Sequence, residues 1–493
     1  MQKQAFNPFL PSYEYIPDGE PYVFGDRVYV YGSHDCFDGP AYCYNDYVCW
    51  SASVDDLSDW RYEGVIYKKT QDPMNADGAH CLYAPDVTKG PDGRYYLYYA
   101  LDRVGIMAVA VCDTPAGEYS FHGLVKRGDG SVVGEKKEFY QFDPGIFIDD
   151  DGRVFLYSGF APRPDTSINA NSTGGRPWEA FGSFVMELEQ DMLTVKRGPE
   201  PLLPTPGKSD GTGFEGHEYF EAPSMRKING RYYLVYSSTN SHELCYATSD
   251  RPDGGFVFGG TLVSIGDVYL DGRSQKDALN YMGNTHGGMV QVKGQWYIFY
   301  HRQTNLHQYS RQACAEKVFI ESDGSIKQVE LTSCGLNDGY LVPEGEYEAR
   351  IACNLISKDG CGFYSFNERQ PACDDPYFTQ EGPDIDAPAS NPPLQYIANF
   401  CNGAVAGFKY FQCDGSAKTL KVNVRGDGKG KLLVSTGLDG AVIGEIDIAP
   451  SQGWQGFETK VTMPEGRQGL FFRFDGVGRF DFRSFCLVSD KRA

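Results

Sequence analysis

A short two-strand pattern recurs five times in the first 335 residues of this 493-residue chain. Each copy has an extended run, a tight Gly-, Asp- or Asn-containing turn and an aromatic-rich run, as in APDVTKGPDGRYYLYY and EAPSMRKINGRYYLVY. The residue after the turn is Arg27, Arg94, Arg153, Arg231 or Gln295, with 59 to 78 residues between successive copies. A hairpin repeated in this way is typical of a propeller or a solenoid. In a propeller the innermost strands face one axis, so residues at their heads are expected to converge.

The repeat stops near residue 335, and the rest of the chain has a different pattern. Residues 336–397 include a Pro- and Asp-rich stretch, and they are interpreted as a linker and the start of a second region. Residues 398–493 alternate short strand patterns at roughly 8–12-residue spacing, which is typical of an antiparallel sandwich. We therefore predict an all-β chain, with a five-bladed β-propeller over 1–335 and a C-terminal β-sandwich over 398–493.

The net charge of the chain favours some classes of binding partner over others. The formal net charge is −21, which disfavours nucleic acid and anionic membranes and suits a neutral substrate. No run of 18 apolar residues occurs, so no membrane-spanning helix is predicted.

The cysteines and the N-terminal segment indicate the compartment. The 14 cysteines have irregular spacing without a CxxC pair, which suits free thiols in a reducing cytoplasm. The alternative is disulfides in the C-terminal third, among Cys353, Cys361 and Cys373. The start, MQKQAFNPFLPSYEY, lacks an apolar signal region, so a cytoplasmic protein is expected.

Three acids occupy equivalent places at the heads of repeat strands. Asp143 in QFDPGIFI and Glu221 in YFEAPSM precede apolar runs, and Asp18 lies in YIPDGEPYVF with Glu20 two residues later. One such acid alone would be read as a turn cap. Three at equivalent positions predict carboxylates that face one axis. In glycoside hydrolysis one carboxyl protonates the leaving oxygen and the other activates water or attacks, and their repulsion separates their pKa values.

Other side chains near the repeats are candidates for sugar contact. Phe142 offers a flat ring to a sugar, with packing between blades as its alternative role. His286, in GNTHGGM, opens the fifth repeat where other copies carry acids, so it could bind substrate, water or a cation, or be structural. Arg302, in FYHRQ, is a candidate partner of the acids, or else a solvated side chain. Contact with a sugar and packing between blades are also the two possible roles of Tyr13, Tyr15, Tyr219 and Phe220.

The sequence Ser33-His34-Asp35 invites comparison with a hydrolase triad. We do not expect a triad there, because contiguous residues at a strand end cannot reach the required geometry.

These segments resemble glycoside hydrolase family 43 from residue 7 to about 335. The resemblance is carried by NPFLP, YAPDV from Tyr83, FDPGIFIDDDGRVFLYSG, EAPSMRKINGRYYLVYSS and THGGMVQVKGQWYIFYHR. It implies a five-bladed propeller in which Asp143 tunes the pKa of the general acid Glu221. The candidate substrate-binding residues are Phe142, His286, Arg302 and Tyr83. No cofactor is implied as required, and a structural calcium ion or a water near His286 is the one candidate.

The first blade departs from the family pattern of Ala-Asp-Pro. Alignment without gaps from VFGDRVYVYGSHD places Asp18 at the general base, whereas Glu20 keeps an acid-proline pair but needs a two-residue gap. We favour Asp18, with Glu20 as the rival. The tail resembles carbohydrate-binding module family 6 over about 398–490, with Trp454 expected in its core.

The sequence thus predicts an inverting, exo-acting glycosidase that releases terminal arabinofuranose or xylose from plant-derived oligosaccharides. β-Galactofuranosidase and arabinan-cleaving activities are alternatives within the same family. A non-catalytic sugar-binding propeller is an alternative from another class, favoured if neither Asp18 nor Glu20 lies near Glu221. A phosphorylase would need a cluster of basic residues in the pocket.

Overall fold

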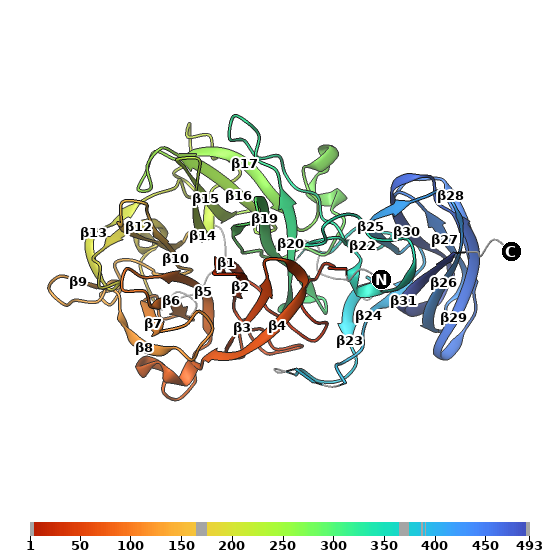
Figure 1. The fold of residues 1–493 in the computed structure, drawn as a ribbon, viewed down its shortest axis with the longest axis horizontal. Coiled ribbons are helices and arrows are strands. Elements are labelled where there is room, and N and C mark those ends of the chain that lie inside the picture. Colours follow the sequence, from red (N-terminus) through yellow and green to blue (C-terminus); the bar gives the residue numbers. More distant parts are fainter. Residues whose placement is uncertain (1–3, 164–174, 364–373, 386–387, 390, 490–493) are drawn as a thin grey trace.

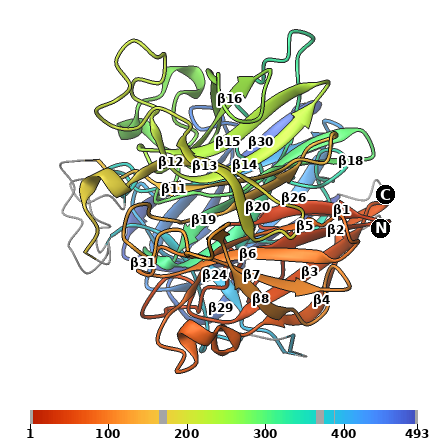
Figure 2. The ribbon, with the colours of Figure 1, turned by 90° about the vertical axis from the view of Figure 1, so that its left-hand side faces the viewer.

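The computed structural model describes residues 4–163, 175–363, 374–385, 388–389 and 391–489. They form a ring of five sheets and, at the other end of the molecule, a sandwich of two sheets (Figure 1). In the turned view of Figure 2 the propeller lies in front of the sandwich. The predicted all-β fold, a five-bladed propeller followed by a sandwich, is confirmed. None of the described helices is long and apolar enough to cross a membrane.

Each blade begins with one copy of the repeat, whose two runs form its first two antiparallel strands. The strands, blade by blade, are β1 (Glu20–Phe24), β2 (Arg27–Tyr31), β3 (Tyr47–Ser53) and β4 (Asp56–Tyr67); β5 (Leu82–Lys89), β6 (Tyr95–Leu101), β7 (Met107–Cys112) and β8 (Ser120–Leu124); β10 (Gly145–Ile148), β11 (Val154–Phe160), β12 (Gly182–Leu188) and β13 (Thr194–Pro201), with β9 (Lys126–Arg127) beside β13; β14 (Tyr219–Ile228), β15 (Arg231–Ser238), β16 (Glu243–Ser249) and β17 (Val257–Ser264); and β18 (Met289–Val292), β19 (Gln295–Thr304) and β20 (His307–Val318).

The turn residues of the repeat are explained by backbone conformation. Asn229 and Gly230, between β14 and β15, have φ angles of 51° and 83°. Two successive positive φ angles match the twist of a two-residue hairpin, and Gly and Asn adopt them at the lowest cost. The repeat therefore encodes a hairpin at the start of each blade.

Five separate apolar clusters join neighbouring blades around the ring. For example, Tyr29 of β2 packs with Leu97 of β6 between blades 1 and 2, and Val28 of β2 packs with Phe299 of β19 between blades 1 and 5. The remaining three clusters lie between blades 2 and 3, 3 and 4, and 4 and 5. Because each sheet is covered on both faces, its strands are apolar on both sides, as β15 shows with seven of eight residues buried.

The N-terminal segment closes the ring along β20, the edge strand of blade 5. Asn7 accepts from the Ala315 N–H at 3.0 Å, and its Nδ2 donates to the Ala315 carbonyl and to Glu316 Oε1, both at 2.8 Å. The Phe9 N–H donates to the Ala313 carbonyl. The segment thus covers an edge that three strands alone leave open.

The C-terminal domain packs two sheets around one core that includes Phe408, Phe472 and Phe482. Trp454 was expected in this core, and that prediction is wrong. It is half-buried outside the core, with Arg425 Cζ 4.3 Å from its ring centroid.

The first sheet of this domain has the order β23 (Tyr377–Gln380), β24 (Gln395–Cys401), β31 (Arg479–Ser489), β26 (Ala417–Gly426) and β29 (Ser451–Thr462), with β21 (Gly345–Glu348) beside β31. The second has the order β22 (Asn354–Ile356), β25 (Val405–Cys413), β30 (Gly466–Val477), β27 (Lys429–Ser435) and β28 (Val442–Ile448).

Helical structure in the described residues is confined to single 3₁₀ turns. They are η1 (Lys69–Gln71), η2 (Pro73–Asn75), η3 (Trp178–Ala180), η4 (Leu270–Gly272), η5 (Gln275–Asp277) and η6 (Ala349–Ile351).

Candidate active site

Four predicted site residues converge at the heads of the innermost strands. Asp18 lies two residues before β1, Asp143 two residues before β10 and Glu221 at the start of β14. His286 lies just before β18, and the glycines that follow Asp18 and His286 form a parallel bridge. The innermost strands contact one another around the axis, so the repeat brings these side chains to one point.

The backbone is strained at the same place in three blades. Asp18 and Asp143 have φ angles of 58° and 43°, and Ala222, next to Glu221, has 66°. Non-glycine residues adopt this region rarely, and it clusters at functional sites.

Asp18 is 4% exposed; Arg311 holds its carboxylate, and His301 Nδ1 accepts from its backbone N–H at 3.2 Å. Arg311 Nη1 donates to Asp18 Oδ1 at 3.0 Å, and His301 Nδ1 lies 3.4 Å from the same oxygen. Burial alone would raise the pKa of Asp18, but the neighbouring basic groups, above all the charge of Arg311, outweigh it and lower that pKa below its usual 3.8. Asp18 is therefore an ionised carboxylate at neutral pH.

Arg311 and Asp35 are site residues that sequence reasoning missed. Arg311 is 1% exposed; its Nε and Nη2 donate to the two carboxylate oxygens of Asp35 at 2.8 and 2.9 Å. This bidentate pair fixes the plane of the guanidinium, which leaves Nη1 directed at Asp18. Asp35 belongs to the Ser33-His34-Asp35 run, so the run positions Arg311 and, as expected, contains no triad. Because Arg311 is paired with two carboxylates, it gives a phosphate little to bind, and the site does not favour a phosphorylase.

Glu221 and Asp143 form a buried carboxyl pair beside Asp18. Burial and then the charge of Asp18 raise the pKa of Glu221 to about 8. Burial and then the charges of Glu221 and Asp18 raise the pKa of Asp143 well above its usual value, although the Ala222 N–H donates to it. His286 Nδ1 lies 3.6 Å from Asp143 Oδ2. At neutral pH Glu221 is thus protonated, whereas Asp18 is not.

Glu20, the rival for the first-blade acid, belongs to a different polar cluster of the axis. Arg226 Nη2 donates to Glu20 Oε2 at 3.0 Å, and Ser224 Oγ donates to the same oxygen at 2.9 Å. Arg226 Cζ also lies 4.6 Å from the ring centroid of Tyr22, whose hydroxyl donates to Asp86 at 2.7 Å. These side chains come from blades 1, 2 and 4, so Glu20 joins blades together, and Asp18 is the first-blade acid coupled to Glu221.

An aromatic wall stands beside the acids on blades 2 to 4. Tyr83 and Phe142 are in edge contact with ring centroids 5.6 Å apart; Phe160 follows at 5.4 Å from Phe142 and Phe220 at 5.0 Å from Phe160. All four side chains are half-buried, so part of each remains accessible. The other aromatic candidates are buried packing residues: Tyr13, Tyr15 and Tyr219.

Arg302 does not pair with the acids, so that prediction is wrong. On β19 it follows His301, and side chains alternate along a strand, so it points away from the axis. Its Nη1 donates to the Ala352 carbonyl at 3.0 Å and its Nη2 to the Arg350 carbonyl at 2.7 Å. Its Cζ lies 3.8 Å from the ring centroid of Phe378. Arg302 therefore holds the sandwich against the propeller.

His286 offers one nitrogen that could ligate a calcium ion. Its Nε2 is buried without a hydrogen-bond partner in the described part of the chain, which leaves one ligand position open. Calcium takes roughly six to eight oxygen ligands. No group of three ligating side chains includes His286 among the described residues. The donor set fits a water, or a calcium ion whose other ligands are mainly water.

A second cluster with metal-binding residue types is structural. His217, Glu243 and Cys245 lie together in blade 4. His217, Ser238 and Thr261 all donate to the Glu243 carboxylate, which fills its acceptor positions. Burial raises the pKa of the Cys245 thiol well above its usual value, so this sulfur stays protonated and is a poor ligand.

Comparison with known proteins identifies the family. A xylosidase/arabinosidase of Thermoclostridium stercorarium is 50% identical over 99% of this chain and 100% of its own. A β-xylosidase/α-arabinofuranosidase structure from a compost microbial metagenome, in complex with xylotriose and calcium-free, is 25% identical with a TM-score of 0.50 over 65% of this chain and 96% of its own. A Xanthomonas citri enzyme complexed with xylose has the same fold, at 23% identity and TM-score 0.51, over 65% and 91%. Residues 14–326 match the family model of glycosyl hydrolases family 43. The chain belongs to this family and is a glycoside hydrolase.

Proposed function

We propose that this glycoside hydrolase releases terminal arabinofuranose or xylose from plant-derived oligosaccharides by an inverting, exo-acting mechanism. The choice of sugar is supported by the relative that is named a xylosidase/arabinosidase and is 50% identical over nearly the whole chain. The observation that carries the mechanism is the convergence of Asp18 and Glu221 in one buried site where only Asp18 has a hydrogen bond from Arg311, so that their pKa values shift in opposite directions. Carboxyl groups whose environments push their pKa values apart are the mark of an acid/base pair.

In the proposed reaction Asp18 takes a proton from water as the water attacks the anomeric carbon. Glu221 gives its proton to the leaving oxygen, and the bond between that oxygen and the anomeric carbon breaks. Arg311 holds Asp18 in its charged form, and Asp143 positions Glu221 through the neighbouring Ala222 N–H. The half-buried wall that includes Tyr83 and Phe142 would contact the sugar.

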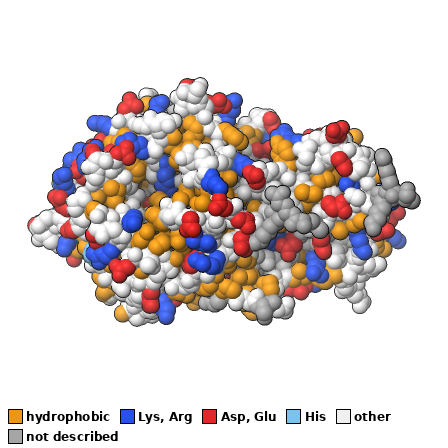
Figure 3. All heavy atoms as spheres, viewed as in Figure 1, with side chains coloured by type: hydrophobic (Ala, Val, Ile, Leu, Met, Phe, Trp, Pro, Cys, Tyr) orange, Lys and Arg blue, Asp and Glu red, His pale blue; other side chains and the backbone are white. Residues whose placement is uncertain are grey.

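No step of the proposed reaction requires a calcium ion. If one binds, His286 would hold it, and the ion would supply positive charge beside the carboxylates. The acidic composition supports a neutral glycan as partner, rather than nucleic acid or an anionic membrane. On the face shown in Figure 3, acidic and basic side chains are interspersed.

A cytoplasmic location is also part of the proposal, supported by buried free thiols among the described residues, such as Cys49, Cys245 and Cys314. Of the candidates for a disulfide, Cys353 is a free thiol, and Cys373 lies outside the described residues. A pairing of Cys361 with Cys373 therefore stays a prediction. The similarity of the sandwich to carbohydrate-binding module family 6 stays a prediction.

The substitution Glu221→Gln tests the proposal. Because the amide cannot donate the acid's proton, cleavage of unactivated arabino- and xylo-oligosaccharides should fall by about 100-fold or more. Nitrophenyl glycosides, whose leaving group needs little protonation, should be affected less. Normal turnover of oligosaccharides by the variant would rule out Glu221 as the acid.

A further inference from the structure

Asp35, the residue that orients Arg311, lies in a long connection between β2 and β3. Residues 32–46, all of them described, contain no strand or helix, so side-chain contacts must fix their conformation. We call this connection the Asp35 loop. Asp35 is fully buried, and its carboxylate accepts from the Cys43 N–H at 2.9 Å as well as from Arg311. The position of Arg311 therefore depends on what holds this loop.

A carboxylate from the segment that follows β23 of the sandwich accepts hydrogen bonds from the Asp35 loop. Asp384 Oδ1 accepts from the Phe37 N–H at 2.7 Å, and Asp384 Oδ2 accepts from Asn45 Nδ2 at 3.1 Å. The same Asn45 Nδ2 donates to the Asp35 carbonyl at 3.2 Å. Phe37 and Asn45 lie toward opposite ends of the loop, so one side chain of the sandwich ties both ends together.

A second residue of the sandwich reaches Asp35 from the other direction along the chain. The Tyr15 hydroxyl donates to Gln380 Oε1 at 2.7 Å, and the Tyr15 carbonyl accepts from the Asp35 N–H at 2.9 Å. Tyr15 is 1% exposed and Gln380 is 6% exposed. The sandwich therefore contacts the neighbours of Asp35 on both sides, through Tyr15 and through Asn45.

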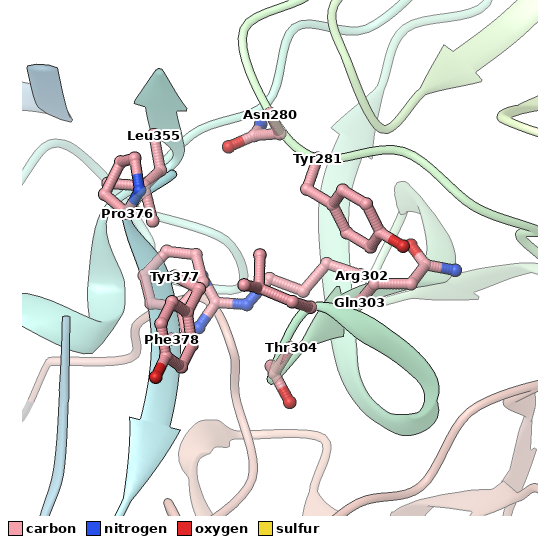
Figure 4. A pocket seen from close by; sticks show the side chains of 10 residues that line it. Asn280, Tyr281, Arg302, Gln303, Thr304, Leu355, Pro376, Tyr377 and Phe378 are labelled. Atoms are coloured by element: carbon pink, nitrogen blue, oxygen red, sulfur yellow. The ribbon is translucent and has the colours of Figure 1, made fainter. Parts of the chain in front are cut away.

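Strand β23 is itself fixed against blade 5. Arg302 of β19 and Phe378 of β23 meet at the boundary between the domains (Figure 4), where Arg302 Cζ lies 3.8 Å from the ring centroid of Phe378. At the hairpin between β19 and β20, the Asn305 N–H donates to the Phe378 carbonyl at 2.8 Å. After the strand, Gln380 Nε2 donates to the Pro383 carbonyl at 3.0 Å. The segment that carries the carboxylate is thus held by contacts that do not involve the Asp35 loop.

We propose that Asp384 of the sandwich is a positioning residue for the catalytic base, acting through the Asp35 loop and Arg311 on Asp18. The contacts run without a gap from Asp384 through Asn45 to Asp35, and from the Asp35 carboxylate through Arg311 to Asp18. The inference rests on the proposed function, in which Asp18 is the base. It gives the sandwich a part in the chemistry that does not require it to bind a sugar.

The substitution Asp384→Ala in the full-length enzyme tests this role, because it removes both acceptors of the loop. A misplacement of about 1 Å can cost about 100-fold in rate, so a partial loosening of Arg311 should lower kcat by about tenfold. KM should change by less than about twofold, because Asp384 reaches the site only through the loop. The base serves every leaving group, so nitrophenyl xyloside and xylo-oligosaccharides should lose the same factor in kcat. Asp384→Asn, which keeps an acceptor for the Phe37 N–H, should lose less.

A double-mutant cycle separates positioning from a general loss of stability. In an Arg311→Lys protein the bidentate pair with Asp35 is already broken, so adding Asp384→Ala should lower kcat by less than about twofold further. Glu381→Ala is the matched control. It removes an exposed carboxylate of the same segment, whose ion pair with Arg425 stays inside the sandwich, and it should leave kcat unchanged.

Unchanged kcat in the Asp384→Ala protein would overturn the proposal, as would a further tenfold loss on the Arg311→Lys background or the same loss in the control. If Asp384→Ala does not fold, Asn45→Ala breaks the same path at its next residue and should give the same loss of kcat; normal kcat in that variant would overturn the proposal. Failure of the proposed function looks different, because the parent enzyme itself would then release neither arabinose nor xylose.

Discussion

At the residue scale, Asp18 and Glu221 show how two carboxyl groups in one cavity acquire different chemistry. Both are at least nine-tenths buried, so desolvation raises the pKa of each. Arg311 reverses this effect for Asp18, with which it makes a direct hydrogen bond. Glu221 has no such bond to Arg311 and instead faces the charge of Asp18.

The pH dependence of kcat/KM should follow these two groups. Glu221 must be protonated to act as the acid, so activity should fall as pH rises through its pKa of about 8. Asp18 must be ionised, and its lowered pKa puts the acidic limb below pH 3.8. Because the folded-state pKa of Glu221 lies above its usual 4.5, its stability contribution is present below pH 4.5 and is lost as pH rises to about 8. A kcat/KM profile whose alkaline limb lies near pH 5 would contradict this assignment.

Substitution of the two first-blade acids should give different defects. Asp18→Asn removes the base and should lower kcat by about 100- to 10 000-fold with the fold retained. Glu20→Gln leaves Arg226 buried without its partner and should lower the free energy of unfolding by about 3–5 kcal/mol. Steady-state kinetics and urea unfolding of both variants measure the two effects. If Asp18→Asn kept normal kcat, Asp18 would not be the base.

The site was predictable from sequence where it follows the repeat. Comparison of the five repeat copies identifies the residues at equivalent strand heads, which are Asp18, Asp143, Glu221 and His286. Arg311 lies on β20, outside every repeat copy, and its role depends on a long-range pair with Asp35. Only a signal outside the repeat, such as an arginine in an otherwise buried strand, could have pointed to it.

At the scale of elements, blade 5 is completed by the N-terminal segment rather than by a fourth strand. Hairpins could be predicted, because each carries its own turn residues and strand pattern. Ring closure could not, because the contact of Asn7 with Ala315 joins residues about 300 positions apart in an irregular segment.

Asn7→Ala should weaken the ring without changing the chemistry. Asn7 is 4% exposed, and its loss removes buried hydrogen bonds to Glu316 and to the N–H and carbonyl of Ala315, at a cost of about 1–3 kcal/mol. Thermal unfolding should show a lower Tm, and kcat of the folded enzyme should be unchanged. Gln291→Ala, an exposed amide on β18 of the same blade, is the control and should leave Tm nearly unchanged. An unaltered Tm for Asn7→Ala would show that this contact does not close the ring.

At the scale of the whole molecule, the two domains are joined by buried polar contacts. Lys409 of β25 is 4% exposed and reaches Glu330 at 2.7 Å and Asp267 at 3.3 Å on the propeller side. Asp384, which follows β23, accepts from the Phe37 N–H at 2.7 Å beside the site. The sequence indicated two domains, but these contacts between distant residues leave no local pattern.

Lys409→Met should uncouple the domains. It leaves Asp267 buried without its cation, at a cost of about 3–5 kcal/mol at the interface. Calorimetry should show one unfolding transition for the parent protein and two for the variant. Lys431→Met, which breaks an exposed ion pair with Glu445, should cost no more than about 1 kcal/mol and keep one transition. A single unshifted transition for Lys409→Met would mean that this contact does not join the domains.

The configuration of the sugar at the moment of release shows directly whether Asp18 and Glu221 act as base and acid. A base and an acid that act through one water molecule displace the leaving group from the opposite face of the ring. Proton NMR during hydrolysis of a β-xyloside should therefore show α-xylose first, with the β anomer appearing later by mutarotation. If β-xylose appears first, the reaction retains configuration, and Asp18 and Glu221 do not act as the proposed base and acid.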